Sequence, residues 1–170
     1  PALAARLLEQ ANVEGFALSG QIAGISEALA LLDVAQLRAL VRSAPLGTTS
    51  RSVPGMNMQQ FWRYSRNTAK LARSLAGSVQ QSQVAAYTAG LLHALGELII
   101  HLAHPDKVQS LNTLVSPLDV RRGKVEQRIF GFGYGTVSAA LARRWHLPQA
   151  VVDALHHQHA PFDNHAYEPL

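Results

Sequence analysis

Residues 82–103 read SQVAAYTAGLLHALGELIIHLA, the longest mainly apolar stretch of the chain. Ser82 can accept a hydrogen bond from the first turn of a helix, so it predicts a helix start. Apolar residues follow on nearly every side, which is typical of a helix at the centre of a protein. Gly96 predicts a break, followed by another helical piece over residues 98–103.

Helical patterns continue on both sides of this stretch. Asn57, followed three residues later by Gln60, resembles a capping box at the start of an amphipathic helix that ends near Gly77. No segment alternates apolar and polar residues as a half-buried strand does, so we predict an all-α fold. Further helices are predicted over residues 3–11, 26–32 (capped by Ser26), 33–41 (capped by Asp33), from 105 onward, 118–129, 135–145 and 149–157.

Composition agrees with a helical domain. Among 170 residues, 26 Ala and 24 Leu far outnumber 13 Val and 5 Ile, and 48% of the chain is hydrophobic. Residues 43–55 are rich in Ser, Thr, Pro and Gly and predict a boundary. We therefore expect a small N-terminal helical subdomain over residues 1–45, a helical core over 46–160 and a tail over 161–170. Because residues 1–10 read as the inside of a helix, we expect the segment to begin within a larger protein.

Charge and cysteine content exclude several classes of function. Charged residues are 15% of the chain, below the roughly 25% of a typical domain, which indicates surface covered by another domain or a second copy. The absence of cysteine excludes thiolate nucleophiles and disulfides and fits the cytoplasm. Arginines are scattered, so we predict a solvated helical face and no nucleic-acid partner. His93, Glu97 and His101 interrupt the apolar stretch, so we expect no membrane span.

Eight histidines suggest a metal hypothesis, because a hydrolytic site needs several converging donors and an open position for water. A structural role is the stronger interpretation for each histidine, as for His93 in its apolar helix. The candidates are His93, His101, His104, His156, His157, His159 and His165. Residues 130–135 read FGFGYG, which lacks the dinucleotide spacing and predicts a helix-to-helix turn; the helix after it could hold an anion at its start.

Five segments, taken in order, resemble the HDOD family, the HD-related output domains of bacterial signalling proteins. The resemblance implies an HD-like bundle of many helices, with the small helical subdomain at its N-terminus. The segments are PALAARLLEQAN (1–12), IAGISEALALL (22–32), FWRYS (61–65), AGLLHALGE (89–97), and FGF (130–132) with WHLP (145–148).

Departures from the pattern argue against catalysis. In catalytic HD relatives, a His-Asp pair and further His and Asp residues hold divalent metal, whereas here Ala94 replaces the aspartate that follows His93. Tyr64, Gly133–Tyr134 and Gln158–His159 stand at the other ligand positions, and Glu97 adds one carboxylate. The resemblance therefore implies no catalytic residue, metal or cofactor, and a vestigial pocket formed by Tyr64, His93, Ala94, Glu97, Tyr134, Gln158 and His159.

The leading hypothesis is a non-catalytic signalling module that binds a sister regulatory domain, another signalling protein or a second copy of itself. Arg63, Arg66 and Arg73, with the 43–55 segment, are candidates for the contact surface. One alternative is an HD-type metal-dependent phosphohydrolase using His93, His101 or His104, and His159. Another is a sensor of a small anionic ligand or nucleotide in the vestigial pocket.

Overall fold

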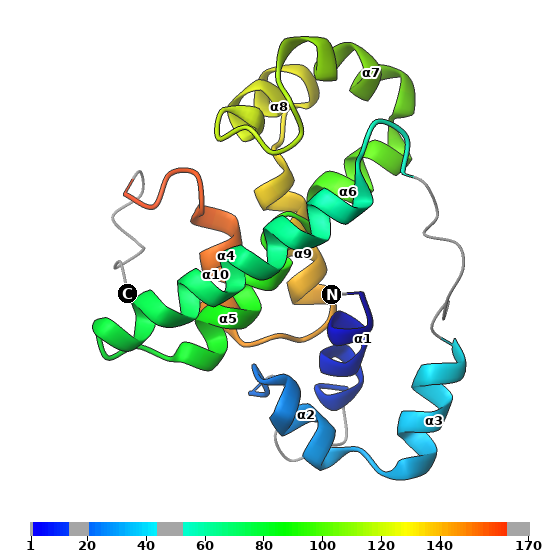
Figure 1. Ribbon diagram of the computed structural model, residues 1–170, viewed down its shortest axis with the longest axis vertical. Coiled ribbons are helices and arrows are strands. Elements are labelled where there is room, and N and C mark those ends of the chain that lie inside the picture. Colours follow the sequence, from blue (N-terminus) through cyan, green and yellow to red (C-terminus); the bar gives the residue numbers. More distant parts are fainter. Residues whose placement is uncertain (1, 14–20, 44–52, 163–170) are drawn as a thin grey trace.

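A computed structural model describes residues 2–13, 21–43 and 53–162, and all regular structure within these ranges is helical (Figure 1). The predicted loop at 43–55 and tail at 161–170 fall largely outside the described residues, and the candidate His165 lies outside them. The helices are α1 (Ala2–Ala11), α2 (Ile25–Leu31), α3 (Val34–Ser43), α4 (Met58–Ser78), α5 (Gln83–Leu92), α6 (Leu95–Ala103), α7 (Pro105–Leu114), α8 (Arg122–Phe130), α9 (Tyr134–Arg144) and α10 (Gln149–His157).

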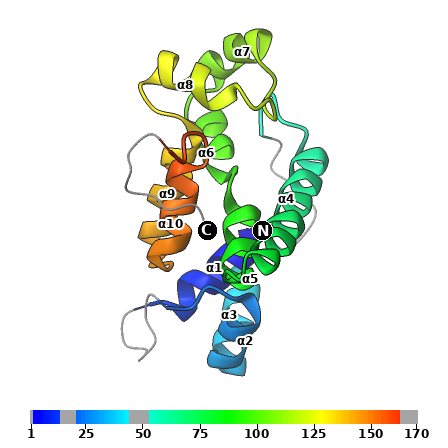
Figure 2. The same ribbon diagram turned by 90° about the vertical axis from the view of Figure 1, so that its left-hand side faces the viewer.

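The helices form a bundle whose two ends are built from different elements. The long α4 lies beside α5, and α10 packs against both α5 and α9. Helix α9 in turn packs against α6. Helices α7 and α8 lie at one end of the molecule and α1–α3 at the other (Figures 1 and 2). The middle of the bundle is therefore the place where α4, α5, α9 and α10 bring distant residues together.

Helix starts follow the capping residues in the sequence, with one exception. The Asn57 side chain accepts a hydrogen bond from the Gln60 amide at 3.0 Å. Asp33 and Gln36 cap each other reciprocally at 2.7 and 2.9 Å. The prediction of Ser26 as a cap is wrong, because α2 begins one residue earlier and Gly24 is its N-cap.

The stretch that predicts a central helix forms α5 and α6. Ser82 caps α5, since its Oγ accepts from the Ala85 amide at 3.2 Å. The break falls at His93–Ala94, and Gly96 lies inside the first turn of α6. Gly96 is needed there for packing: a Cβ on it would lie 2.1 Å from the carbonyl oxygen of Tyr134 in α9.

By length and composition alone, Gln83–Ala103 is long and apolar enough to cross a membrane, contrary to the expectation from its three polar residues. In the structure, 67% of its most apolar window is buried inside the protein. The turn at His93–Ala94 also divides it into two helices. This burial is what a core helix of a folded domain requires.

The N-terminal helices share one hydrophobic cluster with the rest of the bundle. Leu8 of α1 and Ala28 of α2 are fully buried in the same cluster as Phe61 of α4. The Thr88 hydroxyl of α5 also donates a 2.6 Å hydrogen bond to the carbonyl oxygen of Ala23, just before α2. Apolar packing and a buried hydrogen bond thus join α1–α2 to the bundle.

Candidate functional site

His93 occupies the turn between α5 and α6. Its Nδ1 lies 2.8 Å from the carbonyl oxygen of Gly90, so Nδ1–H donates to that oxygen and Nε2 carries the lone pair. Nε2 is buried and has no hydrogen-bond partner among the described residues. Burial lowers the pKa of His93, and the charge of the nearby His159 lowers it further. His93 is therefore a neutral imidazole whose lone pair faces the protein interior.

A tyrosine ring lies against each of two histidines that the sequence places in the pocket. The Tyr64 ring is tilted by 57° over His93, with centroids 5.2 Å apart, and Tyr64 is 38% exposed. The Tyr134 ring meets His159 edge-on, with centroids 4.7 Å apart. The structure thus brings together predicted residues from α4, the end of α5, α9 and the turn after α10. Of the two tyrosines, Tyr64 is exposed and Tyr134 is buried.

The side chain of Gln158 forms hydrogen bonds with the backbone beside His93. Its Nε2 donates to the carbonyl oxygen of His93 at 3.1 Å and to that of Leu155 at 2.9 Å. Ser138 of α9 donates to the same His93 oxygen at 3.0 Å. These bonds fix the His93 turn against α9 and α10 and leave both amide N–H groups of the Gln158 side chain facing backbone carbonyls.

The two histidines border different cavities. His93 and Gln158 line a mainly apolar groove of about 390 Å³ between α4, α5 and α10. His159 lines a cleft of about 550 Å³ between α8, the start of α9 and the end of α10. The pocket predicted from the sequence is therefore divided into an apolar side and a polar side.

Glu97 and Ala94, also predicted for this pocket, are both buried, but Glu97 belongs to another site. Its Oε1 lies 2.9 Å from His101 Nε2 and 2.8 Å from Arg122 Nη2. Arg122 also binds Glu126 at 3.0 Å. We call Glu97, His101, Arg122 and Glu126 the buried polar cluster, because each is fully buried. The expectation of a solvated arginine face is wrong for Arg122, whose partners lie on α6, on α8 and in the segment around α7.

Several backbone and amide groups complete the buried polar cluster. Arg122 Nη1 donates to Asn112 Oδ1 and to the carbonyl oxygen of Val115, both at 2.8 Å. His101 Nδ1 lies 2.7 Å from the carbonyl oxygen of Pro54. Glu126 Oε2 accepts from the amide of Tyr134 at 2.7 Å, which ties the start of α9 to α8. The cluster therefore holds α6, α7, α8 and α9 together.

The cluster contains two carboxyl groups and one guanidinium, so its protonation matters. Burial raises the pKa of Glu126 to about 8, and the neighbouring carboxyl of Glu97 contributes to the rise. Burial lowers the pKa of His101, which favours its neutral form. Near neutral pH the pair of glutamates thus holds a proton, which reduces the uncompensated negative charge beside Arg122.

The donor set does not fit the divalent metal that catalytic HD relatives hold. His93 Nε2, His159 Nε2 and Glu97 Oε2 are buried without hydrogen-bond partners. Across the described ranges, however, no three His, Asp or Glu side chains form a group that could hold a metal ion. Ala94 and Gly133 supply no donor atom at the aspartate positions of the pattern. A hydrolytic metal centre needs several converging donors and an open position.

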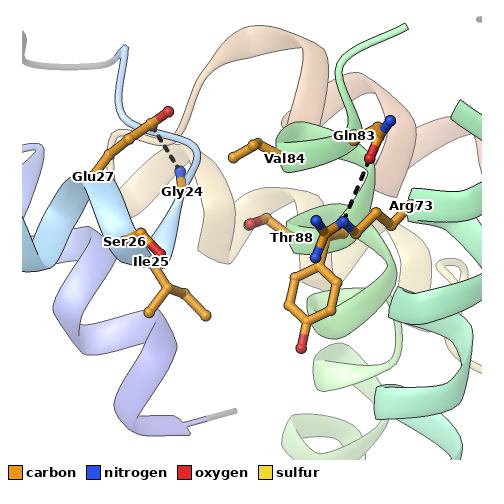
Figure 3. Close-up of a pocket in the computed structure, with 9 residues that line it drawn as sticks. Gly24, Ile25, Ser26, Glu27, Arg73, Gln83, Val84 and Thr88 are labelled. Carbon is orange, nitrogen blue, oxygen red and sulfur yellow. Dashed lines mark hydrogen bonds between the residues drawn. The ribbon is translucent and has the colours of Figure 1, made fainter. Parts of the chain in front are cut away.

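A separate cleft of about 300 Å³ lies between α2 and the α4–α5 pair (Figure 3). Arg73, one of the three predicted surface arginines, borders it and directs its Nε toward Gln83 Oε1 at 3.5 Å. Across the cleft, Glu27 accepts from the Gly24 amide at 3.1 Å. The two charged side chains that line the cleft, Arg73 and Glu27, therefore each form a hydrogen bond on their own side of it. The lining residues are Gly24, Ile25, Ser26, Glu27, Arg73, Gln83, Val84, Tyr87 and Thr88.

The remaining predicted surface residues, Arg63 and Arg66, are exposed on α4. Helical spacing places them on the same face as Arg73.

Sequence reasoning missed Arg122 and Glu126, which are central to the buried polar cluster. The spacing of Glu97 with His101, and of Arg122 with Glu126, is i,i+4, which allows two ion pairs on helix faces. That spacing was visible in the sequence. The contact between Glu97 of α6 and Arg122 of α8, which joins the two pairs, was not.

Comparisons with known proteins agree with this architecture. A model of the HDOD domain family matches residues 1–161. A protein of Treponema pallidum (strain Nichols), itself uncharacterized, is 28% identical over 172 residues. That match covers 99% of this chain and 33% of the Treponema protein, so the chain spans one third of that relative's length.

Two solved structures share the fold. The MmoQ response regulator of Methylococcus capsulatus (strain Bath) matches with a TM-score of 0.76 and 23% identity, over 96% of this chain and 66% of that chain. A protein of Shewanella amazonensis SB2B, provisionally named a phosphohydrolase, matches with a TM-score of 0.67 and 21% identity, over 98% of this chain and 70% of that chain. At these identities the similarity establishes the helical fold.

Proposed function

The chain belongs to the HDOD domain family, and on that premise we propose that it is a non-catalytic regulatory module of a cytoplasmic bacterial signalling protein. One observation carries the proposal: Tyr64 lies against His93 and Tyr134 against His159, at the positions where catalytic relatives gather metal ligands. Aromatic rings fill space and supply no carboxylate to a metal. The same positions that support hydrolysis in those relatives support packing here.

A regulatory module of this kind acts through contacts with another domain or protein. The chain spans only one third of its Treponema relative, and one protein of the same fold is a response regulator, which supports a role beside other signalling domains. The exposed α4 face with Arg63, Arg66 and Arg73 is our candidate for the contact. A sister domain with an acidic surface would complement it.

The test measures metal content, hydrolysis and contact on the full-length protein. We expect substoichiometric Mn, Fe, Ni and Zn after gentle purification. We also expect that any residual hydrolysis of phosphodiesters or nucleotides is the same in the natural protein and in His93→Ala. Stoichiometric metal that is lost in His93→Ala would overturn the proposal in favour of an HD-type phosphohydrolase.

The contact is tested with the triple variant Arg63→Glu, Arg66→Glu and Arg73→Glu, and with Arg143→Glu and Arg144→Glu as the matched control at the end of α9. Crosslinks between this module and its neighbouring domains should decrease in the triple variant and persist in the control. Equal crosslinking in all three proteins would exclude the α4 face as the contact surface.

A further inference from the structure

The cleft beside His159 is lined by positively charged and imidazole side chains from two helices. Lys124 and Arg128 are exposed and lie one turn apart on α8, while the imidazoles come from the end of α10. No carboxylate is among the described residues that line the cleft. The lining residues are Gly123, Lys124, Gln127, Arg128, Gly133, Gly135, Thr136, His156, His157, His159 and Ala160.

The start of α9 forms one wall of this cleft. Its N-cap, Gly133, has no side chain that could bind the first-turn amides. The Tyr134 amide donates to Glu126 Oε2 and the Thr136 amide to the carbonyl oxygen of Gly133, which leaves the Gly135 amide as the candidate donor to a ligand. Glycine also allows close approach here: a Cβ on Gly123 would lie 2.7 Å from His159 Nε2, and one on Gly135 would lie 3.4 Å from the His159 ring. The imidazole of His159 therefore sits directly against the backbone of α8 and α9.

The carboxyl group of Glu126, close to the cleft, is hydrogen-bonded inside the protein. Glu126 lies on α8, but its oxygens accept hydrogen bonds from Arg122 and from the Tyr134 amide inside the protein. His159 Nε2 is buried and has no hydrogen-bond partner among the described residues. Burial lowers the pKa of His159; the charge of Glu126 opposes this effect, and the charge of Lys124 adds to it. A bound anion would compensate the charges of Lys124 and Arg128, neither of which forms a salt bridge with another residue in the part of the chain that the structure describes.

We propose that this cleft binds the phosphate group of a small phosphorylated ligand. Lys124 and Arg128 supply the charge, the Gly135 amide in the first turn of α9 supplies a backbone N–H donor, and the ring of His159 lines the inner end of the cleft. A volume of about 550 Å³ exceeds that of phosphate alone and falls within the range of small-molecule sites. The proposal goes beyond the regulatory role, because it gives the module an input of defined chemistry.

The test uses inorganic phosphate, adenosine monophosphate and adenosine as probes of the full chain. Calorimetry gives affinities, and ¹H–¹⁵N NMR follows the amides of Gly135 and Thr136. We expect inorganic phosphate, adenosine monophosphate or both to bind and shift these amides, while adenosine does not. Lys124→Gln with Arg128→Gln should weaken binding at least about tenfold, as expected for the loss of charge-assisted hydrogen bonds.

The control is Arg143→Gln with Arg144→Gln, which removes the same charge from the other end of α9 and should keep the affinity. Binding of inorganic phosphate alone or of the nucleotide alone supports the proposal and identifies the source of the phosphate. Absence of binding, binding of adenosine as strong as that of the monophosphate, or equal weakening in both double variants would overturn it. These readouts involve neither metal nor hydrolysis, so their failure leaves the proposed regulatory function untouched.

Discussion

Arg122 is fully buried, and its guanidinium joins α8 to α6 and to the segment around α7. A buried guanidinium is tolerated only when its charge and N–H groups are matched, which Glu97, Glu126, Asn112 and a backbone carbonyl do here. The i,i+4 spacing of each acid with its helix partner was readable from the sequence. The proton held by the two glutamates was not, because it depends on how closely two helices approach in space.

Glu97→Gln tests the shared proton. The usual pKa of Glu126 is 4.5, so above this pH the unfolded chain has released the proton. The folded chain keeps the proton until the pH reaches its pKa of about 8. Stability from this group is therefore present at low pH and is lost as pH rises through 8, by at most about 1.4 kcal/mol per pH unit. A glutamine at position 97 removes the neighbouring carboxyl and should lower the pKa of Glu126.

Urea unfolding at several pH values between 6.5 and 8.5 measures this effect. This pH range is chosen to avoid histidine titration. The pKa values of His93, His101 and His159 are lowered in the folded chain, so these groups weaken the folded state only below the usual histidine pKa of 6.5. We expect the free energy of unfolding to fall with pH in the natural chain and to fall less steeply in Glu97→Gln, in which burial alone still raises the pKa of Glu126. Parallel slopes in the two proteins would show that the carboxyl pair holds no shared proton.

Helix α6 crosses α9 at Gly96, and this crossing positions His93. The Ser138 hydroxyl of α9 accepts from the Gly96 amide at 2.8 Å and donates to the His93 carbonyl oxygen. The sequence predicted the helices on both sides and took the glycine for a break. In the structure Gly96 lies directly against the backbone of α9. The residue types along one helix do not indicate where the backbone of another helix approaches it.

Gly96→Ala should destabilise the protein by about 2–4 kcal/mol, because the new methyl group would meet backbone atoms of α9 that cannot move aside. Gly131→Ala is the matched control. Gly131 has φ of 82° and no atom within 4 Å of an added methyl group, so only the backbone conformation is strained, at about 1 kcal/mol. Thermal unfolding of both variants compares them. Equal losses would mean that the α6–α9 contact relaxes more easily than its geometry indicates.

At the scale of the whole molecule, the sequence predicted a helical core and a separate N-terminal subdomain. The all-α fold and the HD-like architecture are confirmed. Where one folding unit ends is decided by tertiary packing, which the Ser, Thr and Pro content of a loop does not encode. The buried residues of α1 and α2 belong to the same hydrophobic cluster as those of α4 and α9, which leads us to expect one cooperative unit.

Thr88→Val tests whether the N-terminal helices unfold with the bundle. Valine keeps the shape of threonine but leaves the carbonyl oxygen of Ala23 buried without its donor, at a cost of about 1–3 kcal/mol. If the chain is one unit, chemical denaturation followed by the fluorescence of Trp62 and Trp145 and by hydrogen exchange in α1 should shift together. Faster exchange confined to α1 and α2, with an unchanged tryptophan transition, would show that these helices open independently. Such local opening beside the cleft of Figure 3 would then be the mobile part of the module.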